Sequence, residues 1–183
     1  LGRRSKLPIV SLLSTIFIEI WRGVPLITVL FMASNMFPLF MPEGVNFDKL
    51  IRALIGVMFF SAAYLAEVVR GGLQAMPKGQ YEASQAAGLT YWKMMALIIL
   101  PQSLKIVIPA IIGSFIALFK DTTLVLIIGL FDFLGIIQFV GTNPDWLGFS
   151  HEGYVFAAAI FWVFCFGMSR YSQRLEKKLD TGH

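Results

Sequence analysis

Very few residues of this sequence could carry out covalent chemistry or hold a metal ion. Cys165 is the only cysteine and lies within an apolar run, which excludes a disulfide within the chain and a cysteine-based metal site. His151 and His183 are the only histidines, and their separation does not fit the helical two-histidine zinc motif. The sequence has no G-x-x-x-x-G-K-[ST] loop that could cradle a nucleotide. These features argue against an enzyme and against a cofactor held by this chain.

Charged and hydroxyl side chains that interrupt apolar sequence suggest a different kind of chemistry, the passage of a polar solute. A charged group at membrane depth is expensive unless it is paired or faces a polar path. We therefore expect such a path to be lined by Ser61, Tyr64, Glu67, Lys120, Asp121 and Thr122. The alternative is structural: Glu67 pairs with Arg70 three residues on, Lys120 and Asp121 form an intramembrane ion pair, and Ser61 and Tyr64 bind a neighbouring helix.

Glu19 and Arg22 form a second charged pair inside apolar sequence. They are three residues apart, so a helix would place them on one face. We expect an ion pair between them that holds the helix bundle together, with a role in a gate or a dimer contact as the alternative.

The composition identifies the environment of these residues. Of the 183 residues, 57% are hydrophobic and 14% are charged, whereas soluble domains are about 45–50% apolar and about 25% charged. A protein whose outer surface faces lipid explains this excess. The net charge of +4 is modest, and the basic residues lie at the ends of apolar stretches. We attribute them to membrane topology and not to nucleic-acid binding.

Four apolar stretches are long enough to cross a bilayer as helices, near residues 9–37, 50–69, 97–119 and 152–170. Lysine and arginine near the ends of spans collect on the cytoplasmic side. Ten basic residues fall on one side if these four stretches alone cross: Arg3, Arg4, Lys6, Arg70, Lys78, Lys93, Arg170, Arg174, Lys177 and Lys178. Both ends of the chain are then cytoplasmic, and Glu43, Asp48, Asp145 and Glu152 lie on the other side with Lys49.

The segment 122–141 is apolar except for Asp132 and is interrupted by Gly129 and Gly135. If it crossed the membrane, the four basic residues at the carboxyl end would lie outside. We therefore expect a short helix or a re-entrant piece, covered by protein at membrane depth.

The loop between the second and third spans has a different composition. Pro77 indicates a helix start, and the residues from Lys78 to Ala87 are rich in helix formers. Gly88 can adopt a positive φ and end that helix, and Thr90 can cap a second helix that runs into the third span. We predict two helices that meet at a glycine corner, with Leu89, Tyr91 and Trp92 exposed at its tip. An exposed apolar tip of this kind suggests a partner that receives it.

This loop contains a motif with fixed spacing. It reads Glu82-Ala83-Ser84, three residues, Gly88, nine residues, then Ile98-Ile99-Leu100-Pro101. The pattern resembles the cytoplasmic EAA loop of ABC importer permeases, E-A-A-x3-G-x9-I-x-L-P, with Ser84 in place of the second alanine as the one departure. The resemblance implies that this loop couples the chain to a separate ATPase through Glu82, Ala83, Ser84, Gly88, Leu89, Ile98, Leu100 and Pro101.

Other segments narrow the resemblance to the polar amino acid uptake family. Arg22-Gly23-Val24-Pro25-Leu26, Ser61-Ala62-Ala63-Tyr64-Leu65-Ala66-Glu67 and Phe119-Lys120-Asp121-Thr122-Thr123-Leu124 are similar to segments of its permeases. The chain is most similar to the general L-amino-acid transporter permeases of Gram-negative bacteria. Because that family has at least one more span before the point where this chain begins, we expect that its amino-terminal part is missing.

The resemblance implies an all-α, polytopic transmembrane bundle of the ABC type I importer permease fold. The transmembrane domain would occupy residues 1–183, with the ATPase-coupling loop within it at 71–101. Its partners would be two ATPase subunits that bind the ATP, a second permease subunit in a homodimer or heterodimer, a periplasmic amino-acid-binding protein and the lipid of the bacterial inner membrane. The alternative from another class is a secondary transporter or channel, which predicts inverted repeats or paired broken helices; neither is visible in the sequence.

Overall fold

The structure, a computed structural model, describes residues 2–5, 7–42, 44 and 47–179. Lys6, Glu43 and His183, for which we drew expectations from the sequence, lie outside the described residues. The α-helices are α1 (Pro8–Gly23), α2 (Leu26–Phe31), α3 (Lys49–Ala75), α4 (Lys78–Ala86), α5 (Tyr91–Met94), α6 (Leu100–Asp121), α7 (Phe133–Val140) and α8 (Ser150–Leu179). Four 3₁₀ turns are η1 (Gly2–Arg4), η3 (Phe37–Phe40), η5 (Thr122–Ile128) and η6 (Pro144–Trp146). Two π-helical turns are η2 (Met32–Met36) and η4 (Met95–Ile99).

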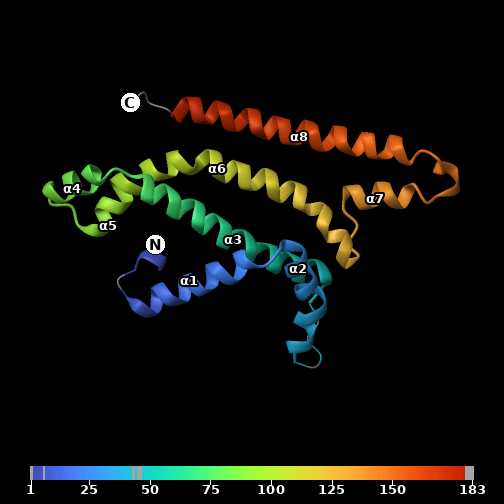
Figure 1. The fold of residues 1–183 in the computed structure, drawn as a ribbon, viewed down its shortest axis with the longest axis horizontal. Helices are drawn as coiled ribbons and strands as arrows, with labels where there is room; N and C mark the ends of the chain where they lie inside the picture. Colours follow the sequence, from blue (N-terminus) through green and yellow to red (C-terminus); the bar gives the residue numbers. More distant parts are fainter. Residues whose placement is uncertain (1, 6, 43, 45–46, 180–183) are drawn as a thin grey trace.

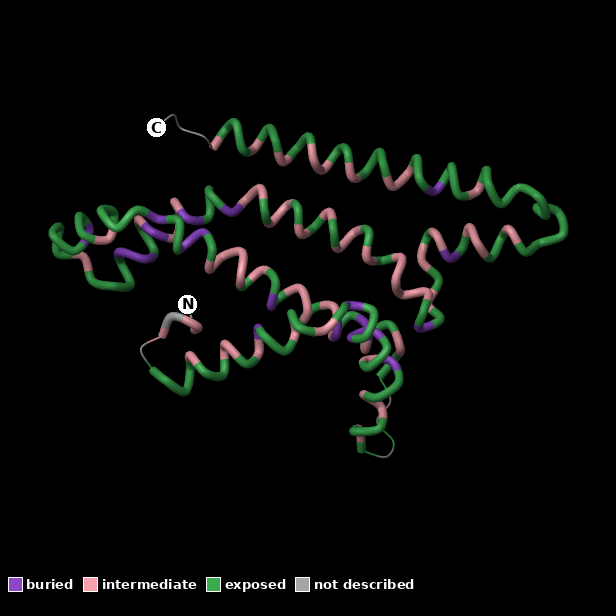
Figure 2. Tube along the Cα trace, in the orientation of Figure 1, coloured by how far each residue is buried: buried purple, intermediate pink, exposed green. Residues whose placement is uncertain are grey.

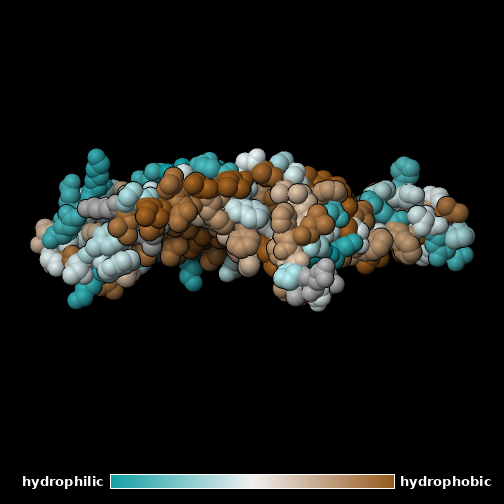
Figure 3. Space-filling model, turned by 90° about the horizontal axis from the view of Figure 1, so that it is seen from below, coloured by the Kyte–Doolittle hydropathy of each residue, from teal (hydrophilic) through white to brown (hydrophobic). Residues whose placement is uncertain are grey.

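The long helices lie side by side as a layer (Figure 1). The α6 helix packs between α3 and α8, and α1 packs along α3. Among the described residues, three helical stretches are long and apolar enough to cross a membrane: Lys49–Ala75, Tyr91–Ile128 and Ser150–Leu179. On the face that Figure 3 shows, hydrophobic residues dominate the middle, whereas hydrophilic ones gather at the two ends. This arrangement confirms the predicted all-α transmembrane bundle.

The first predicted span, near 9–37, is not one continuous helix. The α1 helix ends at Gly23, and the path resumes at Leu26 with a bend of 99°. The cause lies in Pro25, whose ring disfavours helical backbone at the preceding residue; Val24 is extended, with φ −115° and ψ 134°. The fourth span is therefore present only if Pro8–Gly23 and Leu26–Phe40 together count as one bent span.

The segment 122–141 contains no full-length helix, as predicted. Residues Thr122–Ile128 extend α6 as a 3₁₀ turn, and Gly129 then reverses the chain with a φ of 72°. The Asp132 side chain caps α7 by accepting a hydrogen bond from the Gly135 N–H. At eight residues, α7 reaches only about 12 Å, too short to cross the hydrocarbon core.

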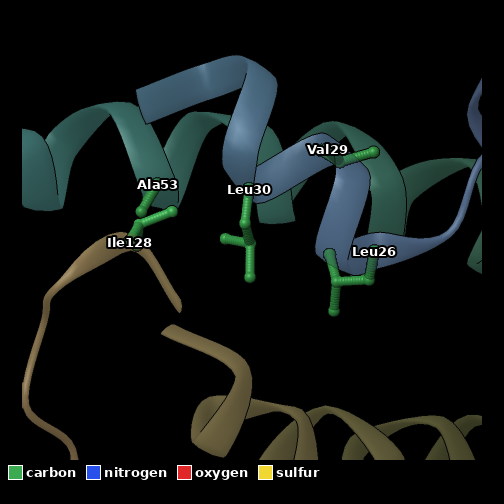
Figure 4. Close-up of a cluster of buried hydrophobic side chains, with 5 residues drawn as sticks. All are labelled: Leu26, Val29, Leu30, Ala53 and Ile128. Atoms are coloured by element: carbon green, nitrogen blue, oxygen red, sulfur yellow. The ribbon is translucent and has the colours of Figure 1, made fainter. Parts of the chain in front are cut away.

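Buried residues gather in two clusters, at the α4–α5 end and where α2 crosses α3 (Figure 2). The second cluster consists of Leu26, Val29, Leu30, Ala53 and Ile128 (Figure 4). It joins the bent first span to α3 and to the η5 turn. The long helices contribute few buried residues between these clusters, as expected for a chain that also contacts lipid or partner subunits.

Candidate functional site

The predicted glycine corner forms at Gly88. The α4 helix begins after Pro77 and ends at Ala86, and Gly88 has a φ of 73°. The Leu89 N–H donates to the Ser84 carbonyl at 3.2 Å, and the Gly88 N–H donates to the Gln85 carbonyl at 2.9 Å. This pair of bonds is the Schellman arrangement, which satisfies carbonyl groups at a helix end and favours glycine at the left-handed position. The corner is thus fixed by local backbone chemistry.

The second helix of the corner starts where the sequence predicts. Thr90 occupies the N-cap position of α5 in extended conformation, although its side chain makes no capping hydrogen bond. The α5 helix continues without a break through η4 into α6. A displacement of the corner would therefore act directly on a membrane-length helix.

The residues predicted to couple the chain to an ATPase divide into an outward and an inward set. Glu82, Ala83 and Gly88 are exposed, as are Tyr91 and Trp92 at the tip. Ser84 is buried, and its hydroxyl donates to the Gln80 carbonyl at 2.6 Å. The prediction that Leu89 is exposed at the tip is wrong: it is half-buried, because the Schellman turn directs it back onto the apolar cluster beneath α4.

That cluster, which anchors the corner, lies in the part of the molecule formed by α4, α5, η4 and the adjoining ends of α3 and α6, which we call the coupling end after the role that the motif predicts. Its buried members are Leu73, Met76, Met94, Met95 and Ile99. Leu89, Ile98 and Leu100 of the predicted motif pack against it, whereas Pro101 is exposed in the first turn of α6. The motif therefore contributes residues both to the exposed surface of the corner and to the apolar cluster that packs beneath it.

Polar contacts and a close helix approach complete this anchor. The Tyr81 hydroxyl donates to the Leu73 carbonyl at 3.3 Å. The Gln102 amide donates to the Gln80 side-chain oxygen at 3.1 Å. A Cβ added to Gly72 would lie 2.3 Å from Val107 Cγ1 and 3.0 Å from the Ser103 carbonyl oxygen, so α3 and α6 touch where no larger residue fits. Sequence reasoning missed this contact; the paired glycines at 71–72 are its visible signal.

A network of charges joins η1, α1 and α3. The Glu67 carboxylate forms an ion pair with Arg70, as the structural alternative predicts. It also forms ion pairs with the guanidinium groups of Arg3 at 3.2 Å and Arg22 at 3.9 Å. The predicted pair of Glu19 with Arg22 is wrong: Glu19 pairs with Arg3 at 2.9 Å. Because α1 packs against both η1 and α3, Glu19 pairs with Arg3 of η1 and Arg22 pairs with Glu67 of α3. Sequence reasoning gave Arg3 no role in pairing.

Three predicted pathway residues line one pocket between α3 and α6. Its volume is about 320 Å³, and its lining includes Ser61, Tyr64 and Asp121. Lys120, Thr122 and Glu67 do not line it. The Arg22 guanidinium lies 5.6 Å from the centre of the Tyr64 ring, a cation–π distance that links the pocket wall to the charge network.

The Lys120–Asp121 ion pair, which is the structural alternative to a pathway role, does not form. Among the described residues, neither side chain lies within 4.0 Å of an opposite charge. The Thr122 hydroxyl donates to the Phe119 carbonyl, and the Thr123 hydroxyl donates to the Lys120 carbonyl. Asp121 thus enters the pocket as a carboxylate that lacks a cationic partner in the described part of the chain.

Comparison with known proteins agrees with this arrangement. The family described as the inner membrane component of binding-protein-dependent transport systems matches residues 1–181. The chain belongs to this family. Its members are membrane permeases of transport systems, not enzymes, and they hold no cofactor of their own.

Relatives of this permease family include amino-acid transporters. The chain is 66% identical over 182 residues to the inner membrane amino-acid ABC transporter permease protein YhdY of Escherichia coli (strain K12), covering 100% of this chain and 50% of that protein. It is 56% identical over 184 residues to the glutamate/glutamine/aspartate/asparagine transport system permease protein BztC of Rhodobacter capsulatus, covering 100% and 42%. The chain spans about half the length of these curated relatives.

The solved structure of an amino acid ABC transporter matches the fold of this chain. The crystal structure of an amino acid ABC transporter with histidines superposes with a TM-score of 0.85 at 28% sequence identity, and the match covers 97% of this chain and 80% of that one. The permease fold expected from the motif is therefore the fold observed.

Proposed function

We propose that this chain forms part of the permease subunit of an ATP-driven importer for polar or general L-amino acids in the bacterial inner membrane. The observation that carries the proposal is the anchored corner at Gly88. An exposed α4 surface, with Glu82 at its centre, is joined through a fixed turn and a packed cluster to two membrane-length helices. A partner that moves α4 would move the spans with it.

The energy source in this proposal is external to the chain. Two ATPase subunits would bind ATP and each receive one corner of this kind, from this chain and from a second permease subunit. A periplasmic binding protein would deliver the substrate. The names of the matched proteins support amino acids as the cargo, and the absence of a nucleotide loop from the sequence supports a separate ATPase.

The pocket formed by Ser61, Tyr64 and Asp121 is our candidate for a substrate contact. Its volume of about 320 Å³ suits a small solute. Asp121 offers a carboxylate for the substrate ammonium, and the hydroxyl groups offer hydrogen bonds to a carboxylate. Glu67 has the geometry of a structural hub, because three arginines already surround it.

Asp121→Asn tests this assignment, because it keeps the size and removes the charge. In the full-length transporter, reconstituted with its ATPase and binding protein, we expect uptake of L-amino acids to fall at least tenfold, the equivalent of one charged hydrogen bond. Assembly and basal ATPase activity should persist. Unchanged uptake kinetics, or loss of assembly, would indicate a structural role for Asp121.

The same reconstituted complex tests the function itself. ATPase activity is measured with a panel of L-amino acids, with matched sugars and inorganic ions as controls. The proposal predicts stimulation by amino acids only, and uptake that stops without ATP. Uptake driven by an ion gradient in the absence of ATP would instead favour a secondary transporter.

A further inference from the structure

A second cavity lies on the other side of α3 and differs from the substrate pocket in its walls. We call it the apolar slot; its volume is about 450 Å³. Its walls come from α1 with Ile20 and Trp21, from η2 and η3 with Ala33 and Phe37, and from α3 with Ile55 and Phe59. Among the residues that line it, only Arg52 is charged. Neither the coupling mechanism nor the substrate path uses this slot.

Arg52 is incompletely paired in the slot. Its Nη1 donates to the Ser34 carbonyl oxygen at 2.9 Å. Its Nε is buried and has no hydrogen-bond partner in the part of the chain that the structure describes. Nor does any carboxylate of the described residues lie within 4.0 Å of the guanidinium. A cation in apolar surroundings with an unused donor is costly, so the site favours an anionic ligand.

The depth of Arg52 indicates which anion fits. It lies four residues into α3 from the Asp48 cap, about 6 Å along the helix axis. In a helix that crosses the membrane, this depth lies near the boundary between headgroups and hydrocarbon. From Arg52 to Phe59 the apolar wall continues for seven residues, about 10 Å further along α3. The slot therefore has a cation at its shallow end and hydrocarbon-compatible walls beyond it.

We propose that the slot binds one anionic phospholipid, with its phosphate at Arg52 and one acyl chain between α1 and α3. A small water-soluble anion would satisfy the guanidinium but leave the apolar walls exposed. A zwitterionic phospholipid would fill the walls, but the cation beside its phosphate would weaken the attraction of that phosphate to the guanidinium. The bend at Val24–Pro25 creates the site, because it turns η2 and η3 across α3 and away from α1.

The first test is lipid retention by the full-length transporter complex. The purified complex is exchanged into detergent with phosphatidylglycerol or phosphatidylcholine of equal chain length, and bound lipid is counted by native mass spectrometry. We expect phosphatidylglycerol to be retained selectively and Arg52→Gln to lower its retention about tenfold, the loss expected for one charged hydrogen bond. Lys49→Gln is the matched control, because it removes a charge one turn away that does not line the slot. Equal retention by both variants, or equal loss in both, would overturn the proposal.

A second test does not depend on a variant of Arg52. A photo-reactive benzoylphenylalanine replaces Ile55, which lines the slot, and the complex is irradiated in native membranes. The proposal predicts an adduct with the mass of an anionic phospholipid. An adduct with polypeptide, from this protein or a partner subunit, would show that a helix fills the slot and would refute lipid binding. If Arg52→Gln fails to assemble, this adduct alone decides between the two outcomes.

Discussion

The coupling end and the carboxyl-terminal helix of this molecule are packed in opposite ways. In the coupling end, Leu73 and Ile99 are 2% and 0% exposed, although α4 itself is largely polar on its outer surface. In α8, Ala157 is the single buried residue of thirty, and Val155 and Trp162 are 70% and 63% exposed. Figure 2 shows the same contrast along the chain.

The contrast indicates how each region obtains its stability. The coupling end buries its own apolar residues, so it can hold a defined shape in water and transmit a displacement. The apolar surface of α8 remains open in the isolated chain and requires lipid or a second subunit to cover it. We therefore expect substitutions in the coupling end to act on transport and folding, and substitutions on the outer face of α8 to act weakly.

The largest effect should come from Gly88→Val. Valine is strongly disfavoured at a φ of 73°, and the strain is on the order of 1–3 kcal/mol. A Cβ at Gly88 would meet nothing within 4 Å in this chain, so the strain comes from the backbone and not from an internal clash. We expect amino-acid uptake by cells to collapse while the protein remains in the membrane, because insertion depends on the apolar spans.

Two variants separate the causes of that loss. Gly88→Asn adds a side chain but tolerates the left-handed backbone, so it should retain more uptake than valine does. Gly71→Val adds the same side chain in open space without a positive φ, and we expect near-normal uptake. Normal uptake by a well-expressed Gly88→Val protein would show that the corner does not couple the ATPase to the spans.

Ile99→Ala should act on stability and reduce uptake less than Gly88→Val does, because it removes a fully buried side chain from the anchor without changing the backbone of the corner. Such substitutions cost about 2–5 kcal/mol through lost contacts and the cavity left behind. The measurement is thermal unfolding of the purified transporter. Leu97→Ala is the matched control, because Leu97 is 67% exposed two residues away. Equal shifts of Tm in the two variants would contradict the assigned anchor.

The smallest effect should come from Val155→Ala on α8. This side chain is largely exposed in the chain, so the change in stability should stay within about 0.5 kcal/mol. The same thermal unfolding assay applies. A loss as large as that of Ile99→Ala would mean that a partner subunit packs tightly on this face.

The sequence alone predicted the structure correctly where the backbone preferences of neighbouring residues determine it. Pro77, Gly88 and Thr90 mark helix ends through their own backbone preferences, and all three lie at the expected helix boundaries. The short helix in the segment 122–141 followed from charge and glycine placement.

Prediction failed where distant residues compete. The expected Glu19–Arg22 pair gave way to contacts with Arg3 and Glu67, and Arg3 lies 64 residues from Glu67. Local sequence spacing does not show which of several oppositely charged residues on neighbouring helices will form the ion pair. The bend at Val24 was readable in principle from Pro25, but the long apolar run outweighed that signal.

Cross-linking from α4 to the ATPase tests the central claim most directly. In the full-length protein, Cys165 is replaced by serine, so that a cysteine introduced by Glu82→Cys is the one reactive thiol within this segment. A short bifunctional reagent is then applied to the assembled, transport-competent complex, with Asp145→Cys at the opposite end of the molecule as the control. We predict that Glu82→Cys yields an adduct with the ATPase and that Asp145→Cys does not. A transporting complex without an ATPase adduct at position 82, or with equal adducts at both positions, would contradict the proposal that this corner couples the ATPase to the membrane helices.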